Sequence, residues 1–530
     1  MALQHAQVTV VVIGYDDAAH VADAVRSALA QGPAVREVIA VDDCSSDGSV
    51  ALLEGLAAGE PRLRVIRRPV NSGGCGTPRN DGLNAATSPY VMFLDSDDVL
   101  PLGAVDALLE AAVRHDAPVA AGLCLRKELP SGRETPWQHE LYTARTLVAH
   151  PARQVRLVRD TLSVNKLYRA DFLRAHRISF PEGRFPYEDF VFTARLLAAG
   201  PSIALVPEPV YLWHVRRSAA RLSISLDRAN IANWRARIEA DRMSYDILLA
   251  AGEKRLARAT RARFLDHSLR MYARELHLRG ADYRREWWTL TRAYLASFDE
   301  GDLTAAPTPG RIVARVVLAA EEPRDLDRLR EVAARPARLN PPYAQAEDGS
   351  PVWSADLPQA ELDHLLLRPA HRLPAAVDAE LRPRARGTVL RLRLHEMYGQ
   401  MAAAGPESVE AEFVERDTGR PAFSQRAFLA ADPDRETWSA EFPVDLAVLG
   451  GGTWDLRLRL RFKDGSHRET TAHALAGAGL LSRRALPSLR YAVLLVQPYA
   501  THSGSLAVRL APGLSGVTDV VRRRLKRFFR

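Results

Sequence analysis

The chain of 530 residues lacks several features that would place it in a specialised class of protein. It has only three cysteines (Cys44, Cys75 and Cys124), and their spacing shows no pairing, which excludes a disulfide framework and gives no indication of a zinc site. It has no run of about eighteen apolar residues that would span a membrane. Its first segment also lacks the basic start and the small-residue cleavage site of a signal peptide. We therefore expect a cytoplasmic protein with reduced thiols.

The chain does contain enough apolar residues for large cores, together with a modest excess of basic charge. Hydrophobic residues make up 47% of the sequence, as in globular proteins. The length predicts roughly two or three domains. The 72 lysines and arginines exceed the 64 acidic residues. Such an excess fits a nucleic-acid, membrane or polyanion partner, or only an arginine-rich genome, which is the simplest explanation.

The basic excess is concentrated at the end of the chain. Residues Arg522–Arg530 read RRRLKRFFR, with six cations and with Leu525, Phe528 and Phe529 between them. Cations interleaved with large apolar side chains favour peripheral contact with an anionic membrane surface, and a solvated tail is the alternative. We therefore treat residues 513–530 as a basic amphipathic tail.

Roughly the first hundred residues alternate short apolar runs with segments of helical periodicity. The runs predict strands, and the segments between them predict helices. The predicted strands are Val8–Ile13, Val38–Val41, Leu63–Arg67 and Tyr90–Leu94, and the predicted helices are Ala18–Ala30, Ser49–Ala58 and Thr77–Ala86. This order is typical of an α/β domain with a parallel sheet and helices on both faces.

Polar side chains follow three of these predicted strands, at the point where each strand ends. They are Tyr15-Asp16, Asp42-Asp43 and Asp95-Ser96-Asp97. Ligands of such sheets bind beyond the carboxyl ends of the strands. The sequence therefore predicts a ligand site at this edge of the sheet.

The periodicity changes twice beyond the first domain. We predict an α/β domain over residues 1–225, a helical linker over 226–305 and a β-sandwich region over 306–512. The second boundary follows the Pro/Gly break at Ala306–Gly310. Thr388–His395 and Trp454–Phe462 then alternate apolar and polar residues, which is typical of half-buried antiparallel strands. The pattern fits an immunoglobulin-like region of one or two modules.

The acidic motif FLDSDD (Phe93–Asp98) follows the fourth predicted strand. Carboxylates at a strand end can bind a hard divalent cation through oxygen and leave room for diphosphate oxygens. Such a cation would neutralise charge on a leaving nucleotide diphosphate. The alternative is an acidic turn that caps a predicted helix at Pro101–His115. The other carboxylates at strand ends favour the cation site.

Three ordered segments carry a resemblance to a known family. They are VTVVVIGYDD (Val8–Asp17), VDDCSSDGS (Val41–Ser49) and NSGGCGTPRNDGLNAATSPYVMFLDSDD (Asn71–Asp98). In order and spacing they resemble the opening strand, the acidic turn, and the glycine-rich loop with metal motif of family 2 glycosyltransferases, which have the GT-A fold. The resemblance extends over about Val8 to Ser225.

The resemblance implies a site for a UDP-sugar. Its residues would be Tyr15, Asp43, Arg79, Asp95, Ser96, Arg216 and Ser223. Tyr15 would border the base, and Asp43 would accept a hydrogen bond from a ring N–H, which suits uracil. Arg79 would meet the diphosphate or the base. The departures at Asp16, where Asn is usual, and at Cys75, where Ser or Ala is common, remove no group that this site needs.

The resemblance also implies a bound Mn²⁺ or Mg²⁺. Asp97 would be its main ligand, and Asp95 would bind the donor sugar or ribose beside it. His214, in the segment YLWHVRRSAARLSIS (Tyr211–Ser225), would be a third ligand, since imidazole suits manganese. A structural histidine is the alternative. Arg216, with Arg217 and Arg221, would pair with diphosphate oxygens, or else form a solvated basic loop.

The motif YEDF (Tyr187–Phe190) supplies a candidate base. An inverting transfer needs a carboxylate that takes the proton of the acceptor hydroxyl as its oxygen attacks the anomeric carbon. In the resembling family the aspartate of a Glu-Asp pair does this, which implies Asp189 as the base with Glu188 beside it. The pair could also cap the helix that follows, and both roles are compatible.

The overall architecture resembles that of wall teichoic acid glycosyltransferases, which have β-sandwich tails. This resemblance implies an anionic glycopolymer, such as a poly(alditol phosphate), as the acceptor, and self-association through the β region. Extension of a capsular, exopolysaccharide or lipid-linked glycan is an alternative from the same enzyme class. A non-catalytic binding protein is a third reading, which the set Asp43, Asp95, Asp97 and Asp189 argues against. We expect no nucleic-acid partner.

Overall fold

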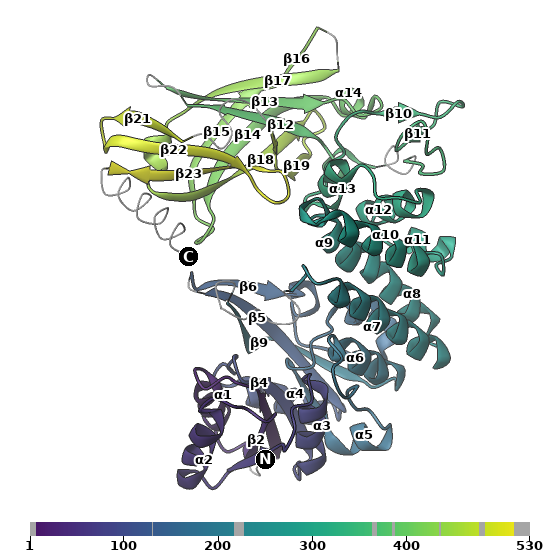
Figure 1. The fold of residues 1–530 in the computed structure, drawn as a ribbon, viewed down its shortest axis with the longest axis vertical. Coiled ribbons are helices and arrows are strands. Elements are labelled where there is room, and N and C mark those ends of the chain that lie inside the picture. The colour runs from purple at the N-terminus through teal and green to yellow at the C-terminus, as the bar shows by residue number, and fades with distance from the viewer. Residues whose placement is uncertain are drawn as a thin grey trace. The chain divides into compact units, whose positions relative to one another are not determined.

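A computed structural model describes residues 7–129, 131–216, 227–362, 368–383, 387–433, 436–475 and 483–513 (Figure 1). The chain divides into two compact units, and each is described by itself. The first comprises Met1–Phe264 and Phe298–Ala306, and the second comprises Leu265–Ser297 and Pro307–Arg530. Ser223, Arg217, Arg221 and the predicted tail from residue 514 onward lie outside the described residues.

A mixed sheet forms the centre of the first unit. Within the described part of the chain it has nine strands in the order β3-β2-β1-β4-β8-β5-β9-β7, with β6 paired to β5. The strands are β1 (Val8–Gly14), β2 (Val35–Asp42), β3 (Leu63–Arg67), β4 (Tyr90–Asp95), β5 (Val119–Leu129), β6 (Arg133–Trp137), β7 (Thr146–Val148), β8 (Lys166–Arg169) and β9 (Ile203–Arg216). The parallel sheet predicted from the sequence is correct for β1 to β4. It does not extend further, because β8 runs antiparallel to both β4 and β5.

β1 and β4 are short apolar runs because both of their faces are covered. β1 is buried from Val8 to Ile13, and β4 is buried from Tyr90 to Leu94. A strand that is buried on both faces needs no alternation of polar residues. The helices of this part are α1 (Val21–Leu29), α2 (Ser49–Gly59), α3 (Gly76–Ala85), α4 (Ala104–Arg114), α5 (Ala170–Ala175) and α6 (Glu188–Ala198).

Two long helices that follow β9 belong to the first unit. They are α7 (Ile231–Ala250) and α8 (Lys254–Arg263), and α11 (Glu300–Ala305) joins them. α7 packs on α6, where the Tyr187 hydroxyl bonds to the Asn233 side chain. The predicted helical linker over residues 226–305 is therefore not one domain. Its first two helices complete the unit that contains the α/β sheet.

The helical region of the second unit extends past the predicted boundary at residue 306. Its helices are α9 (Arg270–Ala273), α10 (Ala281–Leu295), α12 (Thr308–Ala319) and α13 (Leu326–Ala333). The Pro/Gly segment was expected to end the helices, but Pro307 and Pro309 flank the start of α12. Proline is tolerated in a first helical turn because its missing N–H would have no partner there. The boundary at 306 is therefore wrong, and the strand-rich region begins after α13.

Two sheets form the β region of the second unit (Figure 1). Among the described residues, one has five strands in the order β16-β17-β13-β12-β20, and the other has seven, in the order β15-β14-β18-β23-β22-β21 with β19 on β18. The chain passes between the two sheets several times, which makes them one sandwich and not two successive modules. Their strands are β12 (Val377–Arg382), β13 (Thr388–His395), β14 (Pro406–Glu415), β15 (Pro421–Phe428), β16 (Ala430–Ala431), β17 (Thr437–Val444), β18 (Gly452–Phe462), β19 (His467–Thr470), β20 (His473–Ala474), β21 (Arg484–Ser488), β22 (Ala492–Ala500) and β23 (Leu506–Pro512).

The alternation seen in the sequence matches the burial of these strands. In β13, Leu390, Leu392 and Leu394 are buried while the arginines between them are exposed. Smaller elements complete the unit, namely β10 (Ala344–Gln345), β11 (Pro351–Val352), α14 (Gln400–Ala404) and α15 (Leu446–Leu449). None of the helices in the described part of the chain combines the length and the apolar character needed to cross a membrane.

The packing of α3 on β1 depends on Gly82. A Cβ added at Gly82 would lie 2.2 Å from a methyl carbon of Val11, which is fully buried and β-branched. We expect Gly82→Ala to lower the stability of the first unit by about 1–3 kcal/mol, the usual cost of overpacking a core. Gly55→Ala in α2 is the matched control, because a Cβ there meets nothing within 4 Å. Thermal unfolding should show a lower midpoint for Gly82→Ala alone, and equal midpoints would contradict this view of the interface.

Candidate active site

The carboxyl ends of β2, β1 and β4 bring the predicted polar residues to one edge of the sheet. Asp42 pairs with Gly14 across β2 and β1, and Ile13 pairs with Asp95 across β1 and β4. Beyond the strands, the Asp43 N–H donates to the Gly14 carbonyl at 2.9 Å, and the Ser96 N–H donates to the Ile13 carbonyl at 2.9 Å. The loops that carry Tyr15, Asp43 and Asp97 therefore start side by side.

Arg79, on α3, occupies the centre of the site. One guanidinium nitrogen donates to Asp95 Oδ1 at 2.7 Å, and the other donates to Glu188 Oε1 at 2.6 Å and to Asp189 Oδ1 at 3.1 Å. The side chain is only 2% exposed. The sequence predicted a contact of Arg79 with the diphosphate or the base. In the structure, Arg79 joins the acidic motif after β4 to the Glu-Asp pair on α6, and its contact with a diphosphate or a base stays a prediction.

One cation faces three carboxylates in this group, and the imbalance changes their proton affinities. The pKa of Glu188 is raised to about 7 by burial and by the charge of Asp189, against the opposing effect of Arg79. Burial also raises the pKa of Asp189, while Arg79 and a hydrogen bond from Ser163 lower it. The Asp189 side chain is 21% exposed and that of Glu188 only 11%. Asp189 is therefore the more accessible carboxylate of the pair.

The start of α6 positions this pair. Tyr187 precedes the helix with a left-handed backbone (φ 70°), and its side chain makes no capping hydrogen bond. Glu188 and Asp189 form the first turn, where the backbone N–H groups favour negative charge. The pair therefore favours the start of α6 through its charge and not as the cap considered from the sequence, and the same turn brings Asp189 into the site.

Ser163 supports Asp189 and was not identified from the sequence. Its fully buried hydroxyl donates to Asp189 Oδ1 at 2.6 Å. The segment around it is fixed by Asp160, which accepts hydrogen bonds from Lys166 Nζ at 2.8 Å and from Trp137 Nε1 at 3.1 Å. No motif named in the sequence analysis pointed to Ser163.

The acidic motif does not cap the next helix. α4 begins at Ala104 after Gly103, and no side chain caps it. Asp98 is buried and accepts hydrogen bonds from the Tyr211 hydroxyl at 2.7 Å and from the His214 N–H at 2.7 Å. Asp98 therefore fixes the turn to β9. The alternative in which FLDSDD serves as a helix cap is wrong.

Asp97 presents the exposed carboxylate of the motif. Its side chain is 47% exposed, yet burial of the turn and the charges of Asp95 and Asp17 raise its pKa to about 6. The backbone carbonyl of Asp97 accepts a hydrogen bond from Arg216 Nη1 at 2.9 Å. The structure therefore places both Asp97 and Arg216 at the edge where the sequence predicted the cation and the diphosphate.

The predicted ligand His214 makes a different contact. Its Nδ1 lies 3.1 Å from the Asp97 carbonyl oxygen, and burial lowers its pKa, which favours the neutral ring. Within the described residues, no group of three or more His, Cys, Asp or Glu side chains is arranged to hold a metal ion. The predicted set of Asp97, Asp95 and His214 is therefore not gathered into a three-ligand centre.

Asp43 is buried and accepts hydrogen bonds at both carboxylate oxygens. Its carboxylate accepts from the Ser72 N–H at 3.1 Å, from the Ser72 hydroxyl at 2.8 Å and from Asn71 Nδ2 at 3.1 Å, and it pairs with Arg68 Nε at 2.8 Å. The Arg68 contact is an ion pair without a hydrogen bond, so Oδ1 accepts only from the Ser72 N–H and keeps capacity for a further donor. Tyr15 lies at the same edge and is 38% exposed.

Ser96, predicted to contact the donor, instead bonds within the site. Its hydroxyl donates to Asp17 Oδ2 at 2.7 Å. A Cβ on Gly14 would lie 2.9 Å from the Ser96 Cβ, so glycine is what allows this close approach of the two strand ends. Asp17 adds a carboxylate near Asp97 that the sequence reasoning missed. The sequence does contain a signal for Asp17, because it is the second acid of the Asp16-Asp17 pair that follows β1.

The glycine-rich loop packs against the segment that leads to α6. A Cβ on Gly76 would lie 2.0 Å from the Pro181 carbonyl oxygen. Asn80 on α3 donates to the Phe180 carbonyl at 3.0 Å and accepts from the Phe180 N–H at 2.9 Å. Adjacent residues of α3 therefore hold both the approach to α6 and, through Arg79, its first turn.

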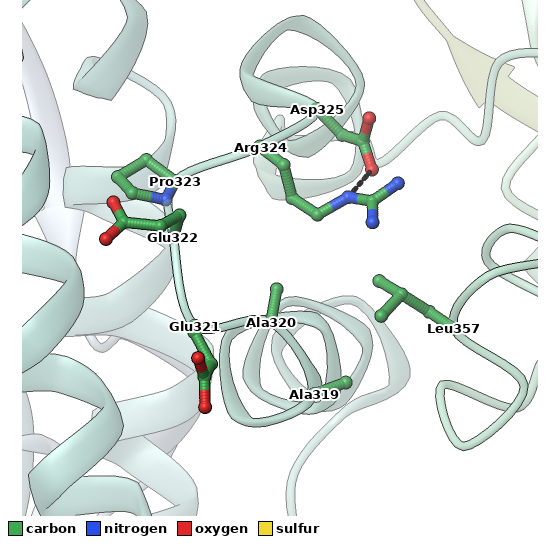
Figure 2. Close-up of a pocket in the computed structure, with 8 residues that line it drawn as sticks. All are labelled: Ala319, Ala320, Glu321, Glu322, Pro323, Arg324, Asp325 and Leu357. Carbon is green, nitrogen blue, oxygen red and sulfur yellow. Dashed lines mark hydrogen bonds and ion pairs between the residues drawn. The ribbon is translucent and has the colours of Figure 1, made fainter.

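A pocket of about 500 Å³ lies elsewhere, in the second unit. Figure 2 shows it between the end of α12 and the loop that precedes α13, where Arg324 bonds to Asp325 at 2.9 Å. It is lined by Ala319, Ala320, Glu321, Glu322, Pro323, Arg324, Asp325 and Leu357. None of the residues predicted for the site lines this pocket.

The carboxyl edge of an α/β sheet, with its acidic loops, is where proteins of this kind bind ligands. Residues 9–176 match the sequence model of the family described as "Glycosyl transferase family 2". The first unit therefore contains a family 2 glycosyltransferase domain.

Two relatives show how far the similarity reaches. The chain is 31% identical over 226 residues to the succinoglycan biosynthesis protein ExoO of Rhizobium meliloti, a match that covers 42% of this chain and 64% of that protein. It is 30% identical over 187 residues to the poly(ribitol-phosphate) beta-N-acetylglucosaminyltransferase TarS of Staphylococcus aureus, covering 35% of this chain and 31% of that protein. The chain thus matches less than two thirds of the length of either relative.

Solved structures extend the likeness of the fold to the whole chain. The crystal structure of S. aureus TarS aligns over 96% of this chain and 85% of its own, with a TM-score of 0.54 and 18% identity. The structure of its residues 1–349 in complex with UDP-GlcNAc covers 65% of this chain and 96% of its own, with a TM-score of 0.51 and 23% identity. At these identities the likeness establishes the fold alone.

Arg79 should be essential for the stability of the site, in a manner that depends on pH. Arg79→Met would leave the buried Glu188 and the partly exposed Asp95 and Asp189 without their cation, and breaking a buried ion pair typically costs about 3–5 kcal/mol. In the native protein the pKa of Glu188 is about 7, above its ordinary value of 4.5. Above pH 7, ionised Glu188 therefore lowers the stability of the folded protein. This cost disappears as the pH falls from 7 toward 4.5, because Glu188 then binds a proton.

We expect Arg79→Met to lower the midpoint of thermal unfolding strongly at pH 8 and much less at pH 5.5, because its carboxylates can then bind protons. Arg26→Met is the control, since Arg26 is exposed on α1 and pairs only with the exposed Asp23. A loss of stability that is equal at the two pH values would contradict this account of the charge group.

Proposed function

We propose that the protein is an inverting, metal-dependent glycosyltransferase that moves a sugar from a UDP-sugar to an anionic cell-wall glycopolymer, such as a poly(alditol phosphate). One observation carries the proposal. A family 2 domain places an accessible carboxylate, Asp189, across Arg79 from the acidic motif at Asp95 and Asp97. This is the arrangement of a base that faces a donor site.

The proposed reaction uses Asp189 as the general base, with Glu188 beside it. Asp189 takes the proton of the acceptor hydroxyl as its oxygen forms a bond to the anomeric carbon. The bond from that carbon to the diphosphate breaks, and its electron pair leaves with UDP. Ser163 and Arg79 orient the Asp189 carboxylate and stabilise its ionised form.

The acidic motif fits a divalent cation, and family 2 glycosyltransferases generally use one. Asp97 and Asp95 offer partly exposed carboxylate oxygens whose mutual repulsion a cation would relieve. Mn²⁺ or Mg²⁺ commonly binds through one or two carboxylates together with substrate phosphates, so a preformed three-ligand centre is not required. When bound, the cation would supply positive charge to the leaving diphosphate. His214 remains a candidate further ligand through its other ring nitrogen.

Several features support a UDP-sugar donor. S. aureus TarS has been crystallised with UDP-GlcNAc, and its fold matches this chain. Tyr15, Asp43 and Ser96 lie at the edge where a nucleotide would bind, and Arg216 lies beside Asp97. An N-acetylhexosamine or a hexose fits the proposal, since relatives include a beta-N-acetylglucosaminyltransferase and a beta-glucosyltransferase.

The acceptor proposal rests on architecture and charge. Two relatives act on poly(ribitol-phosphate) by name, and the whole chain shares the fold of TarS. A net charge of +8 suits a polyanionic acceptor. We include in the proposal a cytoplasmic location, self-association through the β-sandwich and membrane contact through the basic tail, which lies outside the described residues.

The second candidate function is the extension of an exopolysaccharide or lipid-linked glycan. The 31% identity to the succinoglycan biosynthesis protein ExoO favours it. Labelled UDP-N-acetylglucosamine and UDP-glucose should be offered with purified poly(ribitol phosphate) and, separately, with lipid-linked glycan. We expect label in the phosphate polymer, because its charge complements the basic protein. Label only in the glycan would exclude the teichoic-acid proposal and support the alternative.

Two substitutions should separate catalysis from donor binding. Asp189→Asn should reduce transfer by about 10²–10⁴-fold, the usual contribution of a general base, and should leave stabilisation by UDP with Mn²⁺ unchanged. Asp97→Asn should remove that stabilisation, measured as a shift in the unfolding midpoint. Asp106→Asn, at an exposed position of α4, is the control. Full transfer by Asp189→Asn, or no effect of UDP and Mn²⁺ on the native protein, would exclude the proposed mechanism.

A further inference from the structure

The strands β6, β5 and β9 present a row of large side chains on one face, and the mechanism above does not use it. Cys124 on β5 pairs in register with Trp137 on β6 and with Tyr211 on β9. Two residues along β5, Arg126 pairs with Trp213 on β9. Residues in register project to the same face of a sheet, as do residues two apart. Trp137, Tyr211, Arg126 and Trp213 therefore share one face.

This face is linked by hydrogen bonds to both halves of the candidate site. On one side, the Tyr211 hydroxyl donates to Asp98 and accepts from the Asp95 N–H at 3.2 Å, which ties it to the acidic motif. On the other side, Trp137 Nε1 donates to Asp160, which also anchors the segment that carries Ser163. Ser163 in turn contacts the proposed base. A chain bound to this face would thus lie next to residues that hold both halves of the site in place.

The side chains on this face form a compact aromatic and cationic group. The rings of Trp137 and Trp213 meet edge to face, with centroids 6.1 Å apart and an angle of 79° between planes. The guanidinium of Arg126 lies over the Trp213 ring at 5.3 Å and bonds to Glu128 at 2.7 Å. Both tryptophans are half-buried, and Arg126 is 27% exposed. The group therefore remains accessible beside the site.

We infer that Trp137, Trp213 and Arg126 form the acceptor subsite, which binds a repeating unit that carries both an apolar carbon face and a phosphate. This inference rests on the proposed function. The C–H groups of a polyol or sugar pack on indole rings, which bury much area at little cost in side-chain entropy. The Arg126 guanidinium can share its donors between Glu128 and a phosphodiester, because its planar fork matches both.

Lys127 provides a matched control for Arg126. It is the next residue of β5 and so projects to the opposite face, where it pairs with Glu134 at 3.2 Å. Arg126→Gln and Lys127→Gln each remove one cation from one partly exposed ion pair on the same strand. The two substitutions differ in which face of the sheet they alter. Trp213→Leu tests the aromatic part separately.

The probes are purified poly(ribitol phosphate) and UDP-N-acetylglucosamine with Mn²⁺. Isothermal titration should give the Kd of the polymer for each protein, and transfer assays should give KM for the polymer and for the donor. We expect Arg126→Gln and Trp213→Leu to raise the Kd and KM for the polymer about tenfold. The KM for the donor and the unfolding shift with UDP should not change, and Lys127→Gln should behave as the native protein.

The outcomes separate the inference from the proposed function. Equal polymer affinities for Arg126→Gln and Lys127→Gln, with active transfer, would overturn the subsite and leave the enzyme proposal intact. Polymer binding that depends on Arg126, without transfer by the native protein, would overturn the enzyme proposal and retain the binding face. An absence of polymer binding by the native protein would overturn both. An unchanged unfolding midpoint without ligand shows that each variant is folded.

Discussion

The ionic contacts of Arg79 hold the candidate active site together. Its guanidinium lies among carboxylates from β4 and α6, and the side chain is almost fully buried. Removing a charge from water is costly unless hydrogen-bonded partners replace the solvent, and here three carboxylates do so. One cation does not balance three anions. The remaining repulsion, together with burial, raises the pKa of Glu188 to about 7 and defines a site that would gain from further positive charge.

The helices after β9 complete this arrangement, which is why they belong to the first unit. Tyr187 has a left-handed backbone that is unfavourable for a bulky residue, and such strain persists only where the surroundings enforce it. The Arg237 guanidinium lies 4.6 Å from the centroid of the Tyr187 ring, and that of Arg263 lies 4.2 Å from the Phe190 ring. α7 and α8 thus hold both residues that flank the Glu-Asp pair. α7 and α8, which were predicted to be part of a linker, therefore pack behind the proposed base.

The sequence predicted those parts of the structure whose signal is local. Apolar runs located β1 to β4 to within a few residues, and the alternation in Thr388–His395 matched β13 without change. The contacts of Arg79 and Ser163 were not predictable, because each pairs with α6 from a distant part of the chain. The boundary at residue 306 failed because proline near a helix start resembles a break. Local patterns specify elements, whereas long-range pairing decides what each polar group contacts.

The charges on the donor side and on the acceptor side of the proposed site affect each other. Asp95 and Asp189 contact opposite nitrogens of the same guanidinium, and the charge of Asp95 raises the pKa of Asp189, so a positive charge beside Asp95 would offset that repulsion. That change lowers the proton affinity of Asp189 and keeps it ionised. Hydrogen bonds also link the face of Trp137 and Trp213 to this pair. Trp137 donates to Asp160, and Ser163, in the segment that Asp160 anchors, donates to Asp189. A cation at the proposed donor edge would therefore favour ionisation of the proposed base through the charges around Arg79.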